Sequence, residues 1–261
     1  MSAPALLLQA WEAAHTEPSA GLQALGRAAA VALLLISMLL VARALARGGR
    51  YRAVRALGPE ARAALSRGIA DAERRSAGEI AVVVLERSDP HPGAGWIAGA
   101  ASLAAGTALL FGVLPWHRPP LLLLAQAGLF LLGFLLARLL PDFRRLFVSE
   151  GRASAVAREQ AVQEFFAAGL YRTEQGTGVL LFVSLFEHRA LVLGDTGIDA
   201  AVDVAHWEAT CDAVLDGARR GNLAGGLSAG LVLCAEVLER HFPLPERDRN
   251  EVHDHVIVRR E

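Results

Sequence analysis

Two apolar stretches, Glu79–Glu86 (EIAVVVLE) and Gly178–Leu185 (GVLLFVSL), decide the fold. Both are rich in Val and Leu and stay apolar through the middle, which is typical of strands buried on both faces of a sheet. Two further apolar blocks, Trp96–Leu114 and Leu121–Ala137, lie between them. A chain that crosses a membrane and returns leaves both of its flanks on the same side. The sequence therefore predicts one domain that is interrupted by a transmembrane hairpin.

The composition agrees with a chain that is partly embedded in a membrane. Of its 261 residues 53% are hydrophobic, and the mean hydropathy is +0.35. Outside the apolar blocks about 150 residues remain, enough for one domain. The net charge of −1 gives no basic field, so no nucleic-acid partner is expected. Cys211 and Cys234 fall in helical patterns without Cys-x-x-Cys spacing, and we interpret them as small core residues.

The two blocks have the spacing of transmembrane helices. Trp96 and Trp116 are twenty positions apart, as are Arg118 and Arg138, and twenty helical residues cover about 30 Å, the thickness of the hydrocarbon layer. Gln126 is the strongly polar side chain of the second helix, and we expect it to form an interhelical hydrogen bond. A stripe of small residues on the first helix predicts close packing against the second: Gly95, Gly99, Ser102 and Gly106.

A shorter apolar block, Ala28–Ala42, is interpreted as an N-terminal membrane anchor. It spans the bilayer only when the flanking Arg27 and Arg43 snorkel and the whole of 22–45 is used. The predicted organisation is a tail, anchor and Arg-rich linker (1–57), the first part of the domain (58–89), the hairpin (90–140, helices about 95–114 and 119–137) and the second part (141–261).

Arginines set the expected orientation. The hairpin loop holds only Arg118, whereas arginines cluster after the anchor and after the second hairpin helix: Arg43, Arg47, Arg50, Arg52 and Arg55, then Arg138, Arg144, Arg145 and Arg152. By the positive-inside rule the domain is cytoplasmic. We expect a multi-pass protein of a bacterial inner membrane, with the lipid bilayer and other membrane proteins as its partners.

The remaining elements complete an α/β pattern. Its predicted parts are a helix Pro59–Ala77 ended by Gly78, a helix through Val156–Phe166, a strand Arg189–Gly194, and helices Val202–Arg220 and Leu223–His241. The order predicts a small mixed β-sheet flanked by helices. Glu79, Thr177 and Asp195 should share one end of this sheet, and Glu187 and Arg189 the other.

Several ordered motifs resemble the TPM domain family, in the bacterial membrane subgroup with a two-helix insertion after the first strand. The motifs are Ile69–Ile80 (IADAERRSAGEI), Gly176–Arg189, Gly194–Ile198 (GDTGI), the helix with Trp207, and the tail from His241-Phe-Pro to Asp248–Glu251; they spread over Gly58–Val258. The resemblance implies an α/β sandwich of helices around a small sheet. Family members include a thylakoid-lumen acid phosphatase, metal-binding domains and an auxiliary subunit of a receptor, so the resemblance implies a fold without one settled function.

The candidate chemistry lies around a Gly-rich turn. Asp195, Asp199 and Glu79 are candidate ligands of Ca²⁺ or Mg²⁺, which prefer oxygen ligands, and Thr177 is a further candidate site residue. Ordinary turn chemistry with an acidic helix cap is the simpler explanation of the two aspartates. Glu187 and Arg189 form a second candidate pair, expected to be a cross-strand ion pair.

The leading functional hypothesis is a non-catalytic, membrane-tethered interaction or assembly module that holds a divalent cation. The alternative is a metal-assisted phosphatase acting on phosphomonoesters, which would use a metal-bound water at the Asp195 end. The chain offers no Cys-x5-Arg loop and no Asp-x-Asp-x-Thr nucleophile motif. Transport is disfavoured, because the hairpin carries no buried charge pair.

Overall fold

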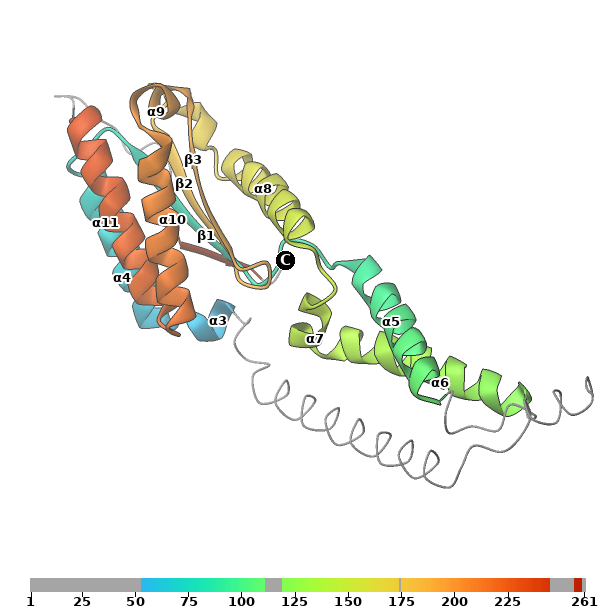
Figure 1. Ribbon diagram of the computed structural model, residues 1–261. Coiled ribbons are helices and arrows are strands. Elements are labelled where there is room, and N and C mark those ends of the chain that lie inside the picture. Colours follow the sequence, from blue (N-terminus) through green and yellow to red (C-terminus); the bar gives the residue numbers. More distant parts are fainter. Residues whose placement is uncertain (1–52, 111–118, 174, 245–255, 260–261) are drawn as a thin grey trace, which may run out of the picture. The chain divides into compact units, whose positions relative to one another are not determined.

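The computed structural model describes residues 53–110, 119–173, 175–244 and 256–259 (Figure 1). The chain divides into an α/β unit, formed by 47–91 and 148–261, and a hairpin unit, formed by 1–46 and 92–147. The predicted anchor at 22–45 lies outside the described residues. In the sequence, 92–147 separates the two parts of the α/β unit.

The α/β unit contains a four-stranded mixed sheet in the order β3-β2-β1-β4 (Figure 1). Its strands are β1 Glu79–Leu85, β2 Gly178–Ser184, β3 Arg189–Gly194 and β4 Val256–Arg259. β2 and β4 pair in parallel with β1, whereas β3 is antiparallel to β2. The mixed sheet is thus confirmed, with β1 and β2 one residue shorter than expected. β4 was not predicted as a member of the sheet.

Helices cover both faces of this sheet, as the strand composition predicts. Every residue of β1 and β2 is buried. On one face lies α8, Glu150–Ala167, whose Phe165 packs in a core with Val83 and Phe182. The other face is covered by three helices (Figure 1): α4 Pro59–Glu73, α10 Val204–Arg219 and α11 Leu223–His241.

Helix caps show which local signals decided the boundaries. Pro59 opens α4, and the side chain of Asn222 accepts the N–H of Gly225 at 3.0 Å to cap α11, both as expected. The prediction that α4 runs to Ala77 and ends at Gly78 is wrong. The helix ends at Glu73, and the chain after it pairs with the segment that follows α11: Ser76 bridges to Pro243, and the N–H of Ala77 donates to the Phe242 carbonyl at 2.9 Å. The Glu73 carboxylate accepts the N–H of Ile80 at 3.0 Å. Three short helices remain: α3 Ala53–Ala56, the 3-10 helix η1 Leu170–Arg172 and α9 Thr196–Ala201.

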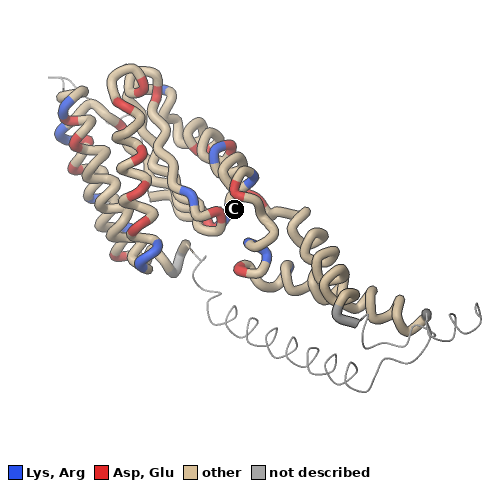
Figure 2. Tube along the Cα trace, viewed as in Figure 1, with Lys and Arg blue, Asp and Glu red and all other residues tan. Residues whose placement is uncertain are grey.

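The hairpin unit consists of α5 Pro92–Leu110, α6 Pro119–Leu139 and the short α7 Pro141–Arg145. Its first two helices carry almost no charged positions (Figure 2). Small residues of α5 face large ones of α6: a Cβ at Gly95 would lie 3.2 Å from the Phe134 ring. Gln126 Nε2 donates to Thr107 Oγ1 at 3.3 Å, so the expected interhelical hydrogen bond is confirmed.

One helix in the described part of the chain, Pro120–Leu139, is long and apolar enough to cross a membrane. Most of its side chains lie outside the packing of the hairpin unit.

Candidate functional site

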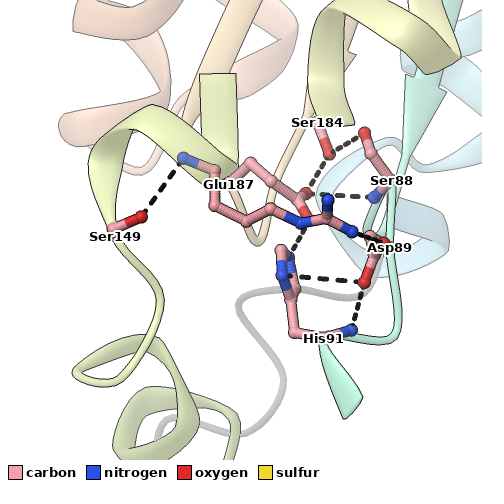
Figure 3. A network of polar contacts seen from close by, with 7 residues as sticks. Ser88, Asp89, His91, Ser149, Ser184 and Glu187 are labelled. Carbon is pink, nitrogen blue, oxygen red and sulfur yellow. Dashed lines mark hydrogen bonds and ion pairs between the residues drawn. The ribbon is translucent and has the colours of Figure 1, made fainter. Parts of the chain in front are cut away.

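A buried carboxylate, that of Glu187, lies at the centre of a polar network in the α/β unit (Figure 3). Glu187 follows β2 in the short connection to β3. Its Oε1 lies 2.7 Å from His91 Nε2, and its Oε2 accepts the N–H of Ser88 at 3.0 Å and the hydroxyl of Ser184. The Ser88 N–H, the Ser184 hydroxyl and a nitrogen of the His91 ring thus converge on one carboxylate.

The same network reaches α8 through Asp89. Asp89 Oδ1 lies 3.7 Å from His91 Nδ1, and Asp89 Oδ2 accepts Arg152 Nη2 at 2.7 Å. Both nitrogens of the His91 ring therefore face carboxylates, and the guanidinium of Arg152 provides a positive charge beside them. The His91 ring also packs against Phe186, with 5.3 Å between ring centroids.

Local sequence explains how these side chains are placed. The run Ser88-Asp-Pro-His-Pro92 leaves β1 and leads into α5, and Asp89 Oδ1 accepts the N–H of His91 in an Asx turn. His91 and His188 both adopt positive φ, at 47° and 53°, a conformation that costs a non-glycine residue about 1 kcal/mol or more. His188 directly follows Glu187 in the chain, and His91 contacts the Glu187 carboxylate, so the hydrogen bonds of Glu187 help to offset the cost of these conformations.

Arg152 owes its position to a helix cap. Ser149 precedes α8, and its hydroxyl accepts the N–H of Arg152 at 3.3 Å. This fixes the first turn of the helix and places Arg152 beside Asp89 (Figure 3 shows Ser149 and Asp89).

The hydrogen bonds of this network join separate segments of the chain. Ser184 donates to Glu187, and His91 Nε2 faces that carboxylate rather than a hydroxyl, so this network contains no serine that is activated by a histidine. Ser88 Oγ donates to Ser184 Oγ at 2.9 Å and closes the ring of contacts. The Glu187 network therefore joins the end of β1, the β2–β3 connection and the first turn of α8.

The structure brings Glu79, Thr177 and Asp195 to the opposite end of the sheet, as expected. The N–H of Glu79 donates to the Thr177 carbonyl at 3.2 Å, and the N–H of Asp195 donates to the Gly178 carbonyl at 2.9 Å. Thr177 Oγ1 is committed to the Ala77 carbonyl at 2.7 Å. Asp195 accepts the N–H of Thr196 at 2.7 Å as the cap of α9.

The Asp195 end carries the features of a helix cap. Asp199 lies one turn further on, in the first turn of α9, where a negative charge is favourable. Within the described ranges, no group of three His, Cys, Asp or Glu side chains is arranged to hold a metal ion. The cation site at Asp195, Asp199 and Glu79 stays a prediction.

The expected ion pair between Glu187 and Arg189 is wrong. Arg189 is directed to α8, where it donates to Ser154 Oγ at 2.9 Å and pairs with Glu150. Glu187 instead turns into the sheet end and binds His91. The two side chains diverge because Glu187 lies in the connection and Arg189 begins β3 on the face covered by α8.

Sequence reasoning missed His91, Ser88, Ser184 and Arg152 as members of the site. The partners lie 96 positions apart in the pair of His91 with Glu187, so no local spacing relates them. The one local signal was the Asp-Pro-His-Pro run, in which two prolines fix the backbone around a single histidine.

Comparison with known proteins identifies no family for this chain. No family model matches the chain, and no curated protein matches it. A solved structure described as the NMR structure of BA42 protein from the psychrophilic bacterium Bizionia argentinensis is similar, with 18% sequence identity and a TM-score of 0.49. The match covers 77% of this chain and 94% of that one.

Proposed function

We propose that the chain is an integral protein of a bacterial inner membrane, in which α5 and α6 form a transmembrane hairpin and 22–45 an additional anchor. The α/β unit would then be a cytoplasmic, TPM-like interaction or assembly module without catalytic activity. Its candidate cation ligands are those at the Asp195 end of the sheet.

The observation that carries the proposal is the outward surface of α6. Seven of its leucines are exposed: Leu121, Leu123, Leu124, Leu131, Leu132, Leu135 and Leu139. A contiguous apolar surface of this kind is rare on proteins surrounded by water and is favourable in lipid. The polar Gln126 is satisfied by Thr107 within the hairpin, as a membrane interior requires.

A binding role fits the described polar groups better than catalysis does. In the Glu187 network the donors and acceptors are directed at one another. The alternative, a metal-assisted phosphatase, draws its support from the backbone pairing that gathers Glu79, Thr177 and Asp195 at one end of the sheet.

Membrane insertion of α6 is tested by introducing one charged side chain on its exposed face. Leu131→Arg places a guanidinium on the exposed face of α6, where insertion into lipid is penalised by about 2.5–3.5 kcal/mol. The proposed anchor and α5 would keep this variant in the membrane, so insertion of α6 is followed with a protease-cleavable tag placed after Glu261. In spheroplasts of Leu131→Arg we expect part of this tag to become accessible to added protease. Val232→Arg is the matched control and should keep the tag protected, because Val232 on α11 is 55% exposed and Leu131 is 54% exposed. Equal protection of the tag in both variants would contradict the proposal.

Catalysis is tested by hydrolysis of p-nitrophenyl phosphate with Ca²⁺, Mg²⁺ or Mn²⁺. The variant Asp195→Asn keeps a good helix cap but removes a charged ligand. Asp203→Asn is its matched control, since Asp203 caps α10 by accepting the N–H of Ala205 at 3.1 Å. We expect no metal-dependent turnover in any of the three proteins. Turnover that is lost only in Asp195→Asn would establish the phosphatase instead.

A further inference from the structure

The outer edge of β1 is divided between two different partners. The backbone groups of even-numbered residues point to this edge, because the N–H of Glu79 points the other way, to Thr177. The N–H of Ile80 donates to the Glu73 carboxylate at 3.0 Å, and the N–H of Glu86 donates to the Arg259 carbonyl at 3.2 Å. Glu73 therefore closes the first part of the edge, and only the part from Val82 onward accepts a strand.

That part of the edge is occupied by β4, which contributes little burial. Val82 pairs with Val256 and Leu85 with Arg259. The residues of β4 are only partly buried or exposed, whereas all of β1 is buried. Ile257 is the one residue of β4 that packs against the core on the α8 face. On the other face β4 contacts α3 and α4. We expect it to open at a lower free-energy cost than the buried strands, because it is a four-residue edge strand without a fully buried residue.

A buried negative charge lies where this strand ends. The Glu164 side chain of α8 is 3% exposed, and its Oε1 accepts Arg259 Nη1 at 3.1 Å and Gln160 Nε2 at 3.3 Å. Among the described residues, Glu164 Oε2 is buried and has no hydrogen-bond partner. The side chain of Arg259 is 46% exposed, so the guanidinium that pairs with Glu164 comes from a short, partly exposed edge strand.

From these contacts we infer that the edge of β1 is a strand-binding site for an extended segment with three apolar residues followed by Arg, which the chain's own β4 occupies. The backbone of Val82–Glu86 supplies the affinity by strand addition, and the Glu164 carboxylate selects the Arg. A protein partner with the same pattern displaces β4. The inference depends on the α/β unit alone, so it is independent of membrane insertion and of phosphatase activity.

Hydrogen exchange on the full chain in detergent tests the lability of β4. The N–H of Val84 and Glu86 face β4, whereas those of Val83 and Leu85 face β2 within the same strand. We expect the two β4-facing amides to exchange at least about tenfold faster, which corresponds to about 1.4 kcal/mol. Equal protection of the four amides would overturn the inference.

Peptide binding tests the site itself. A labelled peptide with the sequence of Asp254–Glu261 (DHVIVRRE) is added to the full chain and followed by fluorescence anisotropy. We expect Arg259→Glu, which repels β4 from Glu164, to bind the peptide about tenfold tighter than the wild type does. Arg219→Glu is the matched control, because Arg219 is an exposed ion-pair residue on α10; it should bind like the wild type.

Specificity is tested with a second peptide in which the residue equivalent to Arg259 is Gln. The Arg259→Glu chain should prefer the Arg peptide, and the preference should vanish when Glu164→Gln is added. Failure of a correctly folded Arg259→Glu chain to bind the Arg peptide would overturn the inference. Equal affinity for the two peptides would overturn the role of Glu164.

Discussion

At the scale of single residues, the α/β unit contains several buried glutamates. Glu187, Glu73 and Glu164 are each buried, and each forms a hydrogen bond with a residue of another element or connection. Burying a charge is costly unless it is paired and hydrogen-bonded. These side chains therefore act as fasteners whose removal leaves unsatisfied donors.

Glu187→Gln should lower the free energy of unfolding by about 1–3 kcal/mol. The amide replaces one accepting carboxylate oxygen with an NH₂ group, so a donor that now binds Glu187 loses its acceptor. Urea unfolding of the purified chain in detergent measures this. Glu150→Gln is the control: Glu150 is 69% exposed in its ion pair with Arg189, and its loss should cost no more than about 1 kcal/mol. Equal losses in the two variants would contradict the role of the network.

The two cysteines should be poorly reactive in the folded chain. Burial raises the pKa of the Cys211 thiol to about 11 and that of Cys234 to about 12, from an ordinary 9.0. Alkylation by iodoacetamide at pH 8 should be slow and should accelerate as the pH approaches 11. Unfolding the chain in urea should make alkylation fast already at pH 8. Because both pKa values are raised, their contribution to stability is fully present below pH 9 and is lost as the pH rises toward 11–12. Rapid labelling of the native chain at pH 8 would contradict this.

At the scale of elements, close helix packing depends on a few glycines. A Cβ at Gly133 of α6 would lie 2.6 Å from the Ala98 carbonyl oxygen of α5, whereas a Cβ at Gly128 meets nothing within 4 Å. The pair offers two identical substitutions on one helix with opposite surroundings.

Gly133→Ala should lower the midpoint of thermal unfolding in detergent, because overpacking costs about 1–3 kcal/mol. Gly128→Ala should leave the midpoint unchanged or raise it, since Ala favours the helix by about 1 kcal/mol over Gly. Circular dichroism at 222 nm follows both. Similar midpoints for the two variants would show that the α5–α6 contact is not the one described.

Elements with local signals were predicted from sequence, and those set by distant contacts were not. The apolar runs of β1 and β2 and the helix starts at Pro59 and Asn222 depend on neighbouring residues, so they can be predicted from the sequence. The chain after α4 pairs with Pro243, far along the sequence, and β4 is four residues long and pairs with β1 alone among the described strands. The Glu187 network was missed for the same reason, because its partners come from opposite sides of the hairpin.

At the scale of the whole molecule, the proposed topology predicts on which side of the membrane the hairpin loop and the C-terminus lie. A protease-cleavable tag inserted between Trp116 and Pro119 should be cut when protease is added to spheroplasts. The same tag placed after Glu261 should be protected there and cut in inverted vesicles. Both results follow from a hairpin that crosses the membrane twice. Cleavage of both tags from one side would exclude that topology.

The insertion of the hairpin between two adjacent strands also has a consequence in time. About 90 residues separate the end of β1 from the start of β2, its neighbour in the sheet. At about 5–20 residues per second, the ribosome needs roughly 5–20 s to deliver the second strand. During that interval β1 has been synthesised without the partner that buries it, while both hydrophobic helices of the hairpin emerge. In the proposed topology, the sheet is therefore completed only after both helices have met the membrane-insertion machinery, and folding of the domain follows insertion of the hairpin.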